Sequence, residues 1–250
     1  MITPDYLRIY ISDTKFINDS AEYDRIYRSL PEFRMKKVDS FRNEEVRKQS
    51  MTVFALLVLG LKEIGIDVSD EAEWEKLGFS LRTHGKPYFT GRRDIHFSMS
   101  HTKGAAMCAI SGSSIGCDIE HIRHRMSLYS VARRALTDRE LALCMQSPGI
   151  TEATDPNALN DPAASLNKAG ICIDPRRFYH IWTRKEAYAK YTGEGLQRIL
   201  TGFDSAEVPA HLYSEDLNDH IWSVCMPAGL YTDYAVKNAL KVCSSFSDLA

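Results

Sequence analysis

Short apolar segments between residues 79 and 120 constrain the fold of this chain more than any other feature. They are FSLR (79–82), KPYF (86–89), DIHFSMSH (94–101), AAMCAIS (105–111) and IGCDIE (115–120). Turn signals separate them, at His84-Gly85, Thr90-Gly91 and Ser111-Gly112. Short apolar runs bounded by such turns predict strands, so we expect the middle of the chain to be rich in β-structure.

Helical segments flank this region. Before them, Leu7, Ile9 and Ile11 alternate in YLRIYIS and predict a first strand. Helices are predicted over residues 21–30, 31–64, 127–146 and 178–192. Residues 147–176 have no clear period and predict a long loop, and later strands are expected around 220–226 and 231–237. The order of strand, helices and strands occurs twice, with a break near Ser113. We therefore predict an α+β fold of two similar halves, 1–113 and 114–250, related by a pseudo-twofold axis.

Composition is that of an ordinary globular protein. The chain has 250 residues, 44% hydrophobic and 26% charged, with a net charge of −2 that gives no reason to expect nucleic-acid binding. Its six cysteines form no CxxC pair, which favours reduced thiols in a cytosol-like compartment. The N-terminus shows no signal-peptide pattern, and the longest apolar run (51–61) is too short to cross a bilayer. We predict a cytoplasmic monomer that binds neither nucleic acid nor membrane.

The stretch SIGCDIEHIR (114–123) places two acids close together. Residues i and i+2 of a strand point to the same side, so Asp118 and Glu120 would crowd two negative charges onto one face. Either a cation, a basic partner or a proton offsets that repulsion, or both carboxylates are solvated at an exposed strand end.

A second acidic position lies in WTRKEAYAK (182–190). On a helix, Trp182, Glu186 and Lys190 follow i, i+4 and i+8 and share one stripe. A carboxylate beside a tryptophan faces a partly buried place and needs a cation or metal there. The alternative is a surface ion pair between Glu186 and Lys190.

Basic and hydroxyl residues in the first half suggest anion binding. Gly85-Lys86-Pro87 is a stiff turn that presents a lysine, and HFSMSH (96–101) ends with Ser100 and His101. Neighbouring strand residues point opposite ways, so a Ser–His acyl-transfer dyad is a poor interpretation, and either a phosphate clamp or a structural histidine fits better. Basic residues also gather before the 51–61 run, which predicts either a solvated helix face or an anion site; they are Arg34, Lys36, Lys37, Arg42, Arg47 and Lys48.

Taken together, GKPYF, HFSMSH, GCDIE and WTRKEAYAK, in this order and spacing, resemble the 4′-phosphopantetheinyl transferases. The chain looks like the larger, surfactin-synthetase-activating type, a single chain of two similar halves. The resemblance implies transfer of the phosphopantetheine arm of coenzyme A to a serine of an apo acyl or peptidyl carrier protein, with release of adenosine 3′,5′-bisphosphate. It also implies Mg²⁺, with Mn²⁺ as an alternative. It leaves open whether the carrier belongs to a nonribosomal peptide, polyketide or fatty-acid synthase, and thus whether the pathway is secondary metabolism.

The resemblance also assigns roles to residues. Asp118, Glu120 and Glu186 would hold the metal, and Glu186 is the expected general base. Lys190 would contact the phosphate that joins the arm, and Lys185 would give electrostatic support. The remaining matches are to coenzyme-binding or site-lining residues: Ser100 and His101 at the coenzyme phosphates, Lys86 at the nucleotide, Arg34 and Lys37 at the ribose 3′-phosphate, and Glu140 lining the site.

This sequence departs from the family pattern at a few positions. Gln49 stands where relatives commonly carry an arginine, and Lys48 beside it is a point charge and not a fork. Ile119 between the two acids cannot be a metal ligand, so water would fill that position. The 147–176 loop is long, and it either tunes the choice of carrier or is a passive insertion.

Two other functions fit some of these residues. A metal-dependent phosphodiesterase would use Asp118, Glu120 and Glu186 to activate water, although only HIRH (121–124) resembles a histidine ligand run. A non-catalytic module would bind coenzyme A or a carrier protein, but the intact set of three acids and Lys190 argues against it.

Overall fold

The computed structural model describes residues 6–123, 128–146, 172–195 and 202–243, in a mixture of helices and sheets that confirms the predicted α+β class. Within these ranges every helix is too short or too polar to cross a bilayer. The predicted division at Ser113 and the pseudo-twofold axis stay predictions.

The first sheet has the strand order β11-β1-β5-β4. It contains β1 (Leu7–Asp13), β4 (His96–Thr102), β5 (Ala105–Ser111) and β11 (Leu240–Cys243). β1 and β4 are each antiparallel to β5, whereas β11 pairs with β1 in parallel. The end of the described chain thus joins the sheet formed by its beginning.

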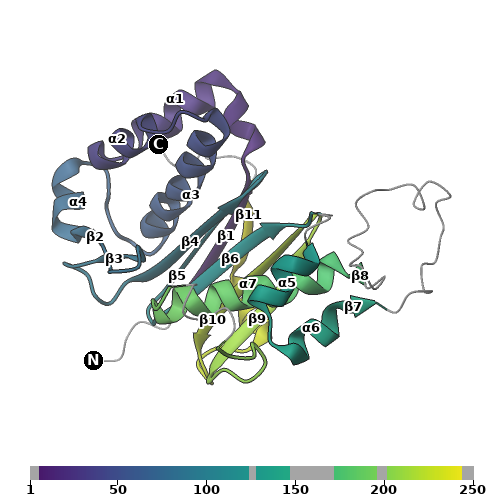
Figure 1. Ribbon diagram of the computed structural model, residues 1–250. Helices are drawn as coiled ribbons and strands as arrows, with labels where there is room; N and C mark the ends of the chain where they lie inside the picture. Colours follow the sequence, from purple (N-terminus) through teal and green to yellow (C-terminus); the bar gives the residue numbers. More distant parts are fainter. Residues whose placement is uncertain (1–5, 124–127, 147–171, 196–201, 244–250) are drawn as a thin grey trace.

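Helices cover one face of this sheet (Figure 1). They are the 3₁₀ helix η1 (Lys15–Asn18), α1 (Ser20–Arg28), α2 (Glu32–Asp39), α3 (Glu44–Glu63) and α4 (Glu71–Leu77). The apolar run predicted to form a buried helix lies in α3 and is almost wholly buried against the sheet. Beside it, β2 (Phe79–Leu81) and β3 (Pro87–Phe89) form a small hairpin.

The second sheet has the order β6-β10-β9. It contains β6 (Gly116–His121), β9 (Ala210–Leu217) and β10 (His220–Pro227), and helix α7 (Pro175–Thr192) packs across it. α7 continues into a smaller cluster with α5 (Leu128–Ala135), α6 (Asp138–Cys144) and the short pair β7 (Met145–Gln146) and β8 (Cys172–Ile173). A core of apolar side chains joins the inner faces of the two sheets.

The structure corrects several of the predicted elements. Residues 31–64 form two helices because the chain turns after α2 and Asn43 caps a new helix by accepting from the backbone N–H of Val46. Residues 231–237 do not form a strand, since Thr232 accepts from Ala235 N and starts helix α8 (Asp233–Ala239). The sequence analysis did not predict β9.

The predicted loop at 147–176 lies mostly outside the described residues. Its last residues are ordered differently from the prediction: Cys172–Ile173 pair with Met145–Gln146, and α7 already begins at Pro175. Asp174 caps α7 by accepting from the N–H groups of Arg176 and Arg177, so this helix starts earlier than its apolar pattern indicates.

Candidate active site

The two carboxylates of GCDIE lie on one face of β6, as the spacing predicts. Cys117 and Ile119 alternate with them and are fully buried between the two sheets. Asp118 and Glu120 therefore point away from that core, toward α7. Asp118 is only 4% exposed, so its charge needs partners inside the protein.

Gly116 allows α7 to lie directly on β6 at this point. A Cβ atom at Gly116 would sit 2.0 Å from the carbonyl oxygen of Ala187 and 2.4 Å from the nitrogen of Tyr191, both backbone atoms of α7. The helix then ends at Gly193, which adopts the left-handed conformation. The glycine of the motif thus brings the stripe with Glu186 and Lys190 against the acids of β6.

Lys190 is the cation that meets Asp118. Its Nζ lies 2.7 Å from Asp118 Oδ1 and 2.9 Å from Ser100 Oγ, and Ser100 Oγ donates to the same carboxylate oxygen at 2.7 Å. Burial disfavours the charge of Lys190, but Asp118, Cys117 and Glu186 outweigh it and raise the pKa of the amine. Lys190 therefore pairs with Asp118, whereas the surface-pair alternative expected it to pair with Glu186.

The other two acids are less well compensated. The pKa of Glu186 is raised to about 7, first by burial and then by the negative charge of Asp118. Burial and Asp118 likewise raise the pKa of Glu120, against a hydrogen bond from Thr102. Three carboxylates in one half-buried place therefore resist ionising together.

The donor set fits a hard cation such as Mg²⁺. Asp118 Oδ2 is buried and accepts no hydrogen bond from the described residues, and the pKa values of Glu120 and Glu186 are raised, first by burial and then by the negative charge of Asp118. Carboxylate oxygens are the protein ligands that Mg²⁺ prefers. In this arrangement, however, no three His, Cys, Asp or Glu side chains of the described residues are grouped as a metal-binding cluster. The metal assignment of Asp118, Glu120 and Glu186 stays a prediction.

Ser100 and His101 point in different directions. They occupy opposite faces of β4, with Ser100 buried against Asp118 and Lys190 and His101 exposed. Their shared role at the coenzyme phosphates stays a prediction.

Lys86 bridges parts of the chain that are far apart in sequence. Its Nζ donates to the carbonyl oxygens of Ile115 and Tyr191, both at 3.1 Å, just before β6 and at the end of α7. Burial and nearby Arg82 lower its pKa to about 8. Lys86, which was predicted to contact the nucleotide, thus links the β2–β3 hairpin to the start of β6 and the end of α7.

Two adjoining cavities lie beside these residues. One, of about 280 Å³, is lined by Lys86, Glu186 and Lys190, and the other, of about 560 Å³, by Arg34 and Lys37. Gly85, Pro87 and Met99 line both, so the two cavities adjoin at the hairpin.

Arg34 and Lys37 lie on α2 at the larger cavity. The Arg34 guanidinium donates to the hydroxyl and carbonyl of Ser50 and lies over the ring of Phe54, and burial lowers its pKa to about 10. Lys37 Nζ lies over the ring of Phe41. Gln49, at the position that departs from the family pattern, donates to Glu45 on its own helix.

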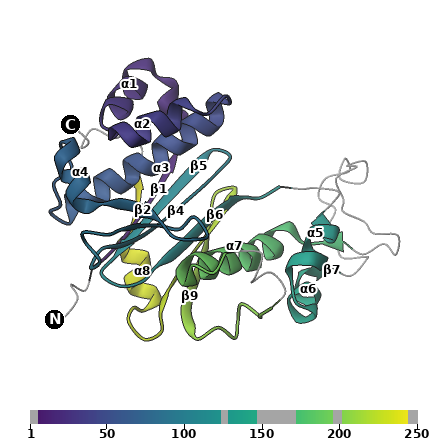
Figure 2. The same cartoon turned by 60° about the vertical axis from the view of Figure 1, so that its left-hand side comes forward.

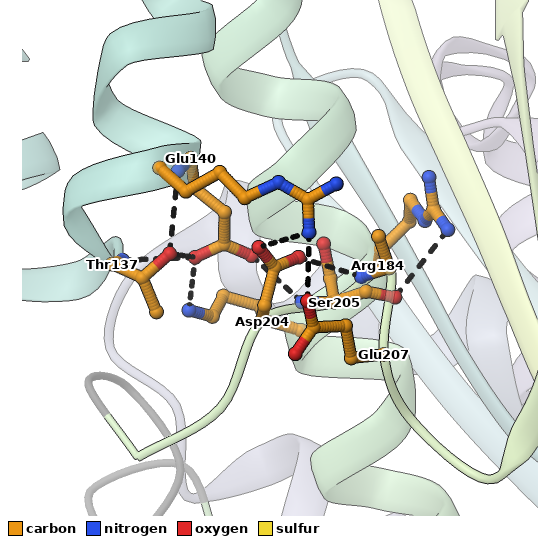
Figure 3. A network of polar contacts seen from close by, with 9 residues as sticks. Thr137, Glu140, Arg184, Asp204, Ser205 and Glu207 are labelled. Atoms are coloured by element: carbon orange, nitrogen blue, oxygen red, sulfur yellow. Dashed lines mark hydrogen bonds and ion pairs between the residues drawn. The ribbon is translucent and has the colours of Figure 1, made fainter.

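Glu140 lies in a separate network of polar contacts (Figure 3), where it pairs with Lys185. Their charged groups are 2.6 Å apart, and the two side chains are 0% and 1% exposed. Glu140 also accepts from the N–H groups of Ser205 and Thr137. The ammonium of Lys185 is directed at Glu140 and the Phe203 ring, so it ties α7 to α6. Neither Lys185 nor Glu140 lines either cavity, and their predicted roles at the site stay predictions.

The hydroxyl that contacts Glu120 was not predicted from the sequence. Thr102, at the end of β4, donates to Glu120 Oε2 at 3.0 Å and is 6% exposed. The alternation of Ser98, Ser100 and Thr102 in the sequence is the signal that could have found it, because these residues share one face of a strand.

The site thus combines three acids, a half-buried lysine and two adjoining cavities with basic side chains in their walls. Residues 114–221 match the family model of the 4′-phosphopantetheinyl transferase superfamily. Among curated relatives, a 4′-phosphopantetheinyl transferase of Bacillus subtilis is 24% identical over 185 residues, 74% of this chain and 69% of the relative. These similarities support a 4′-phosphopantetheinyl transferase.

Two further relatives carry the same description. The 4′-phosphopantetheinyl transferase HetI of Nostoc sp. is 30% identical over 48% of this chain and 44% of its own length. The 4′-phosphopantetheinyl transferase Sfp of Bacillus subtilis is 26% identical over 69% of this chain and 64% of its own. The matched regions thus span less than two thirds of these two relatives.

Proposed function

We propose that this protein transfers the 4′-phosphopantetheine arm of coenzyme A to a serine of an apo acyl or peptidyl carrier protein. The observation that carries the proposal is the contact of Lys190 with Asp118 and Ser100. Lys190 and Glu186 also line a cavity that adjoins a second cavity with basic side chains in its wall. Coenzyme A has two separate anionic parts, a diphosphate and a ribose 3′-phosphate. Lys190 and Lys86 suit the first part, and Arg34 and Lys37 suit the second.

Glu186 is the proposed general base. A carboxyl with a pKa near 7 is half ionised at neutral pH and still basic enough to accept a proton in the transition state. The carrier serine oxygen forms a bond to the phosphorus nearer the pantetheine, and its proton passes to Glu186. The bond from that phosphorus to the bridging oxygen breaks, and adenosine 3′,5′-bisphosphate leaves with the electron pair.

Asp118, Glu120 and Glu186 are the residues that would hold Mg²⁺. When bound, the cation would offset the charge of the diphosphate and of the leaving group. Lys190 supplies positive charge from the other side of Asp118 and can turn to the phosphate that joins the arm. A carboxylate has two oxygens, so Glu186 can face a cation with one and accept the serine proton with the other.

The larger, two-halved type of the family, a monomeric state and a cytoplasmic location belong to the same proposal. The relatives that support this type are matched over only part of their length; the match to Sfp, for example, covers 64% of that protein. The carrier and its pathway would be identified by the assay below.

Intact-mass analysis of a panel of apo carrier proteins, incubated with coenzyme A and Mg²⁺, tests the function. Covalent gain of the arm, lost with EDTA, is expected, and a ranking of carriers would indicate the pathway. Cleavage of coenzyme A without transfer would support a phosphodiesterase, and binding without either reaction would support a binding module. In the same assay Asp118→Asn, an isosteric change, should abolish transfer while the protein stays folded; near-normal turnover would refute the metal assignment.

A further inference from the structure

Hydroxyl side chains hold together the two strands that meet at the active site. β4 is an edge of the first sheet and β6 an edge of the second, and they run side by side without a backbone ladder between them (Figures 1 and 2). Ser98, Ser100 and Thr102 alternate along β4, and all three bond to β6. All three are at most 8% exposed.

Each hydroxyl of this row has a different partner. Ser98 Oγ accepts from the backbone N–H of Cys117 at 3.0 Å, and in the described part of the chain it has no hydrogen bond to an acid. Ser100 Oγ donates to Asp118, which Lys190 also contacts. Thr102 Oγ1 alone contacts Glu120 among the hydrogen bonds of the described residues.

The hydroxyl of Thr102 donates its proton to Glu120. The N–H of His121 points at Thr102 Oγ1 at 3.4 Å, and because an N–H can only donate, the oxygen accepts there. A hydroxyl has a single proton, which is therefore free for Glu120 Oε2. The β-branched side chain restricts rotation about χ1, so the donor direction is fixed by the backbone of β4.

We propose that Thr102 is a positioning residue for metal binding: its hydroxyl holds one oxygen of Glu120 and turns the other toward Asp118 and Glu186. The inference rests on the proposed function, because it concerns the cation that this function uses. Groups that hydrogen-bond metal-ligating side chains fix their orientation, and their loss typically lowers metal affinity or activity about 10–100-fold.

Binding of Mn²⁺ alone to the full-length protein, followed by electron paramagnetic resonance of free Mn²⁺ without coenzyme A, tests this inference. Thr102→Val keeps the shape and removes the hydroxyl, and it should weaken Mn²⁺ binding at least tenfold. Thr102→Ser keeps the donor and should restore the affinity. If the valine variant does not fold, Thr102→Ala replaces it and carries the same expectation.

Ser98→Ala is the matched control, since it removes a buried hydroxyl from the same row that bonds only to backbone. It should lower the urea midpoint of unfolding and leave Mn²⁺ affinity unchanged. Equal Mn²⁺ affinity of wild type and Thr102→Val would overturn the inference, and so would an equal loss in Ser98→Ala.

The proposed function fails separately from this inference. If the wild-type protein loads no carrier, the function is wrong. If it loads carriers and binds Mn²⁺, but Thr102→Val does so equally well, only the role of Thr102 is wrong. A wild type that loads carriers but binds no Mn²⁺ would overturn the inference together with the metal assignment.

Discussion

Replacing Gly116 with alanine should move helix α7, with Glu186 and Lys190, away from the acids of strand β6 without changing any of these side chains. The added Cβ would lie 2.0 Å from the Ala187 carbonyl oxygen, whereas ordinary contact begins at 3.4 Å, so α7 must move by about 1.4 Å. Both clashing partners are backbone, so side-chain rotation cannot relieve the clash. Displacing reacting groups by about 1 Å can lower a rate about 10²-fold, and we expect a loss of that size in kcat for carrier loading.

The assay compares carrier loading and thermal unfolding in Gly116→Ala and Gly60→Ala. Gly60 lies in α3 in the helical core, where an added Cβ would come within 2.3 Å of the Ile110 side chain. Overpacking of this kind destabilises by about 1–3 kcal/mol, so Gly60→Ala should change Tm while kcat stays close to wild type.

Full catalytic activity in a folded Gly116→Ala protein would refute this reasoning, because α7 would then not need its close contact with β6. An equal loss of kcat in Gly60→Ala would also refute it, since crowding alone would then explain the effect.

Three further predictions concern other parts of the site. Burial raises the pKa of Glu186 to about 7, so in the metal-free protein the folded state binds this proton more tightly than the unfolded chain; stability in urea should therefore fall as pH rises from 4.5 to about 7, and a stability that stays constant over this range would contradict the raised pKa. Lys185→Met leaves Glu140 charged and buried and should lower the free energy of unfolding by about 3–5 kcal/mol, and adding Glu140→Gln should recover part of it in urea titrations; a folded double variant without activity would instead indicate a direct catalytic role. Arg34→Ala with Lys37→Ala should raise KM for coenzyme A about tenfold or more, and KM for dephospho-coenzyme A much less; equal effects would remove the reason to place them at the 3′-phosphate.

Local patterns determined much of this fold. The strand segments between 79 and 120 were predicted because short apolar runs and glycine turns are read from neighbouring residues. Predictions failed where a capping side chain overrode the pattern, as at Asn43, Thr232 and Asp174. Strand β9 was missed because no element was assigned to residues 210–217 from their sequence.

The acidic residues of the site were found for the same local reason. Alternation along β6 fixes the shared face of Asp118 and Glu120, and helical spacing fixes the shared stripe of Glu186 and Lys190. Both follow from backbone geometry within a single element. The sequence therefore determined which side chains lie together on each strand or helix.

Only the tertiary structure decided which of these faces meet. In the folded protein Lys190 pairs with Asp118, and Lys185 pairs with Glu140. The Lys86 ammonium donates to two backbone carbonyls, and Thr102 donates to Glu120. These contacts join residues 18 to 105 positions apart, and the packing of two sheets and one helix sets their distances. No local pattern encodes that packing, because it depends on the fit of whole elements, as the contact of α7 with Gly116 illustrates.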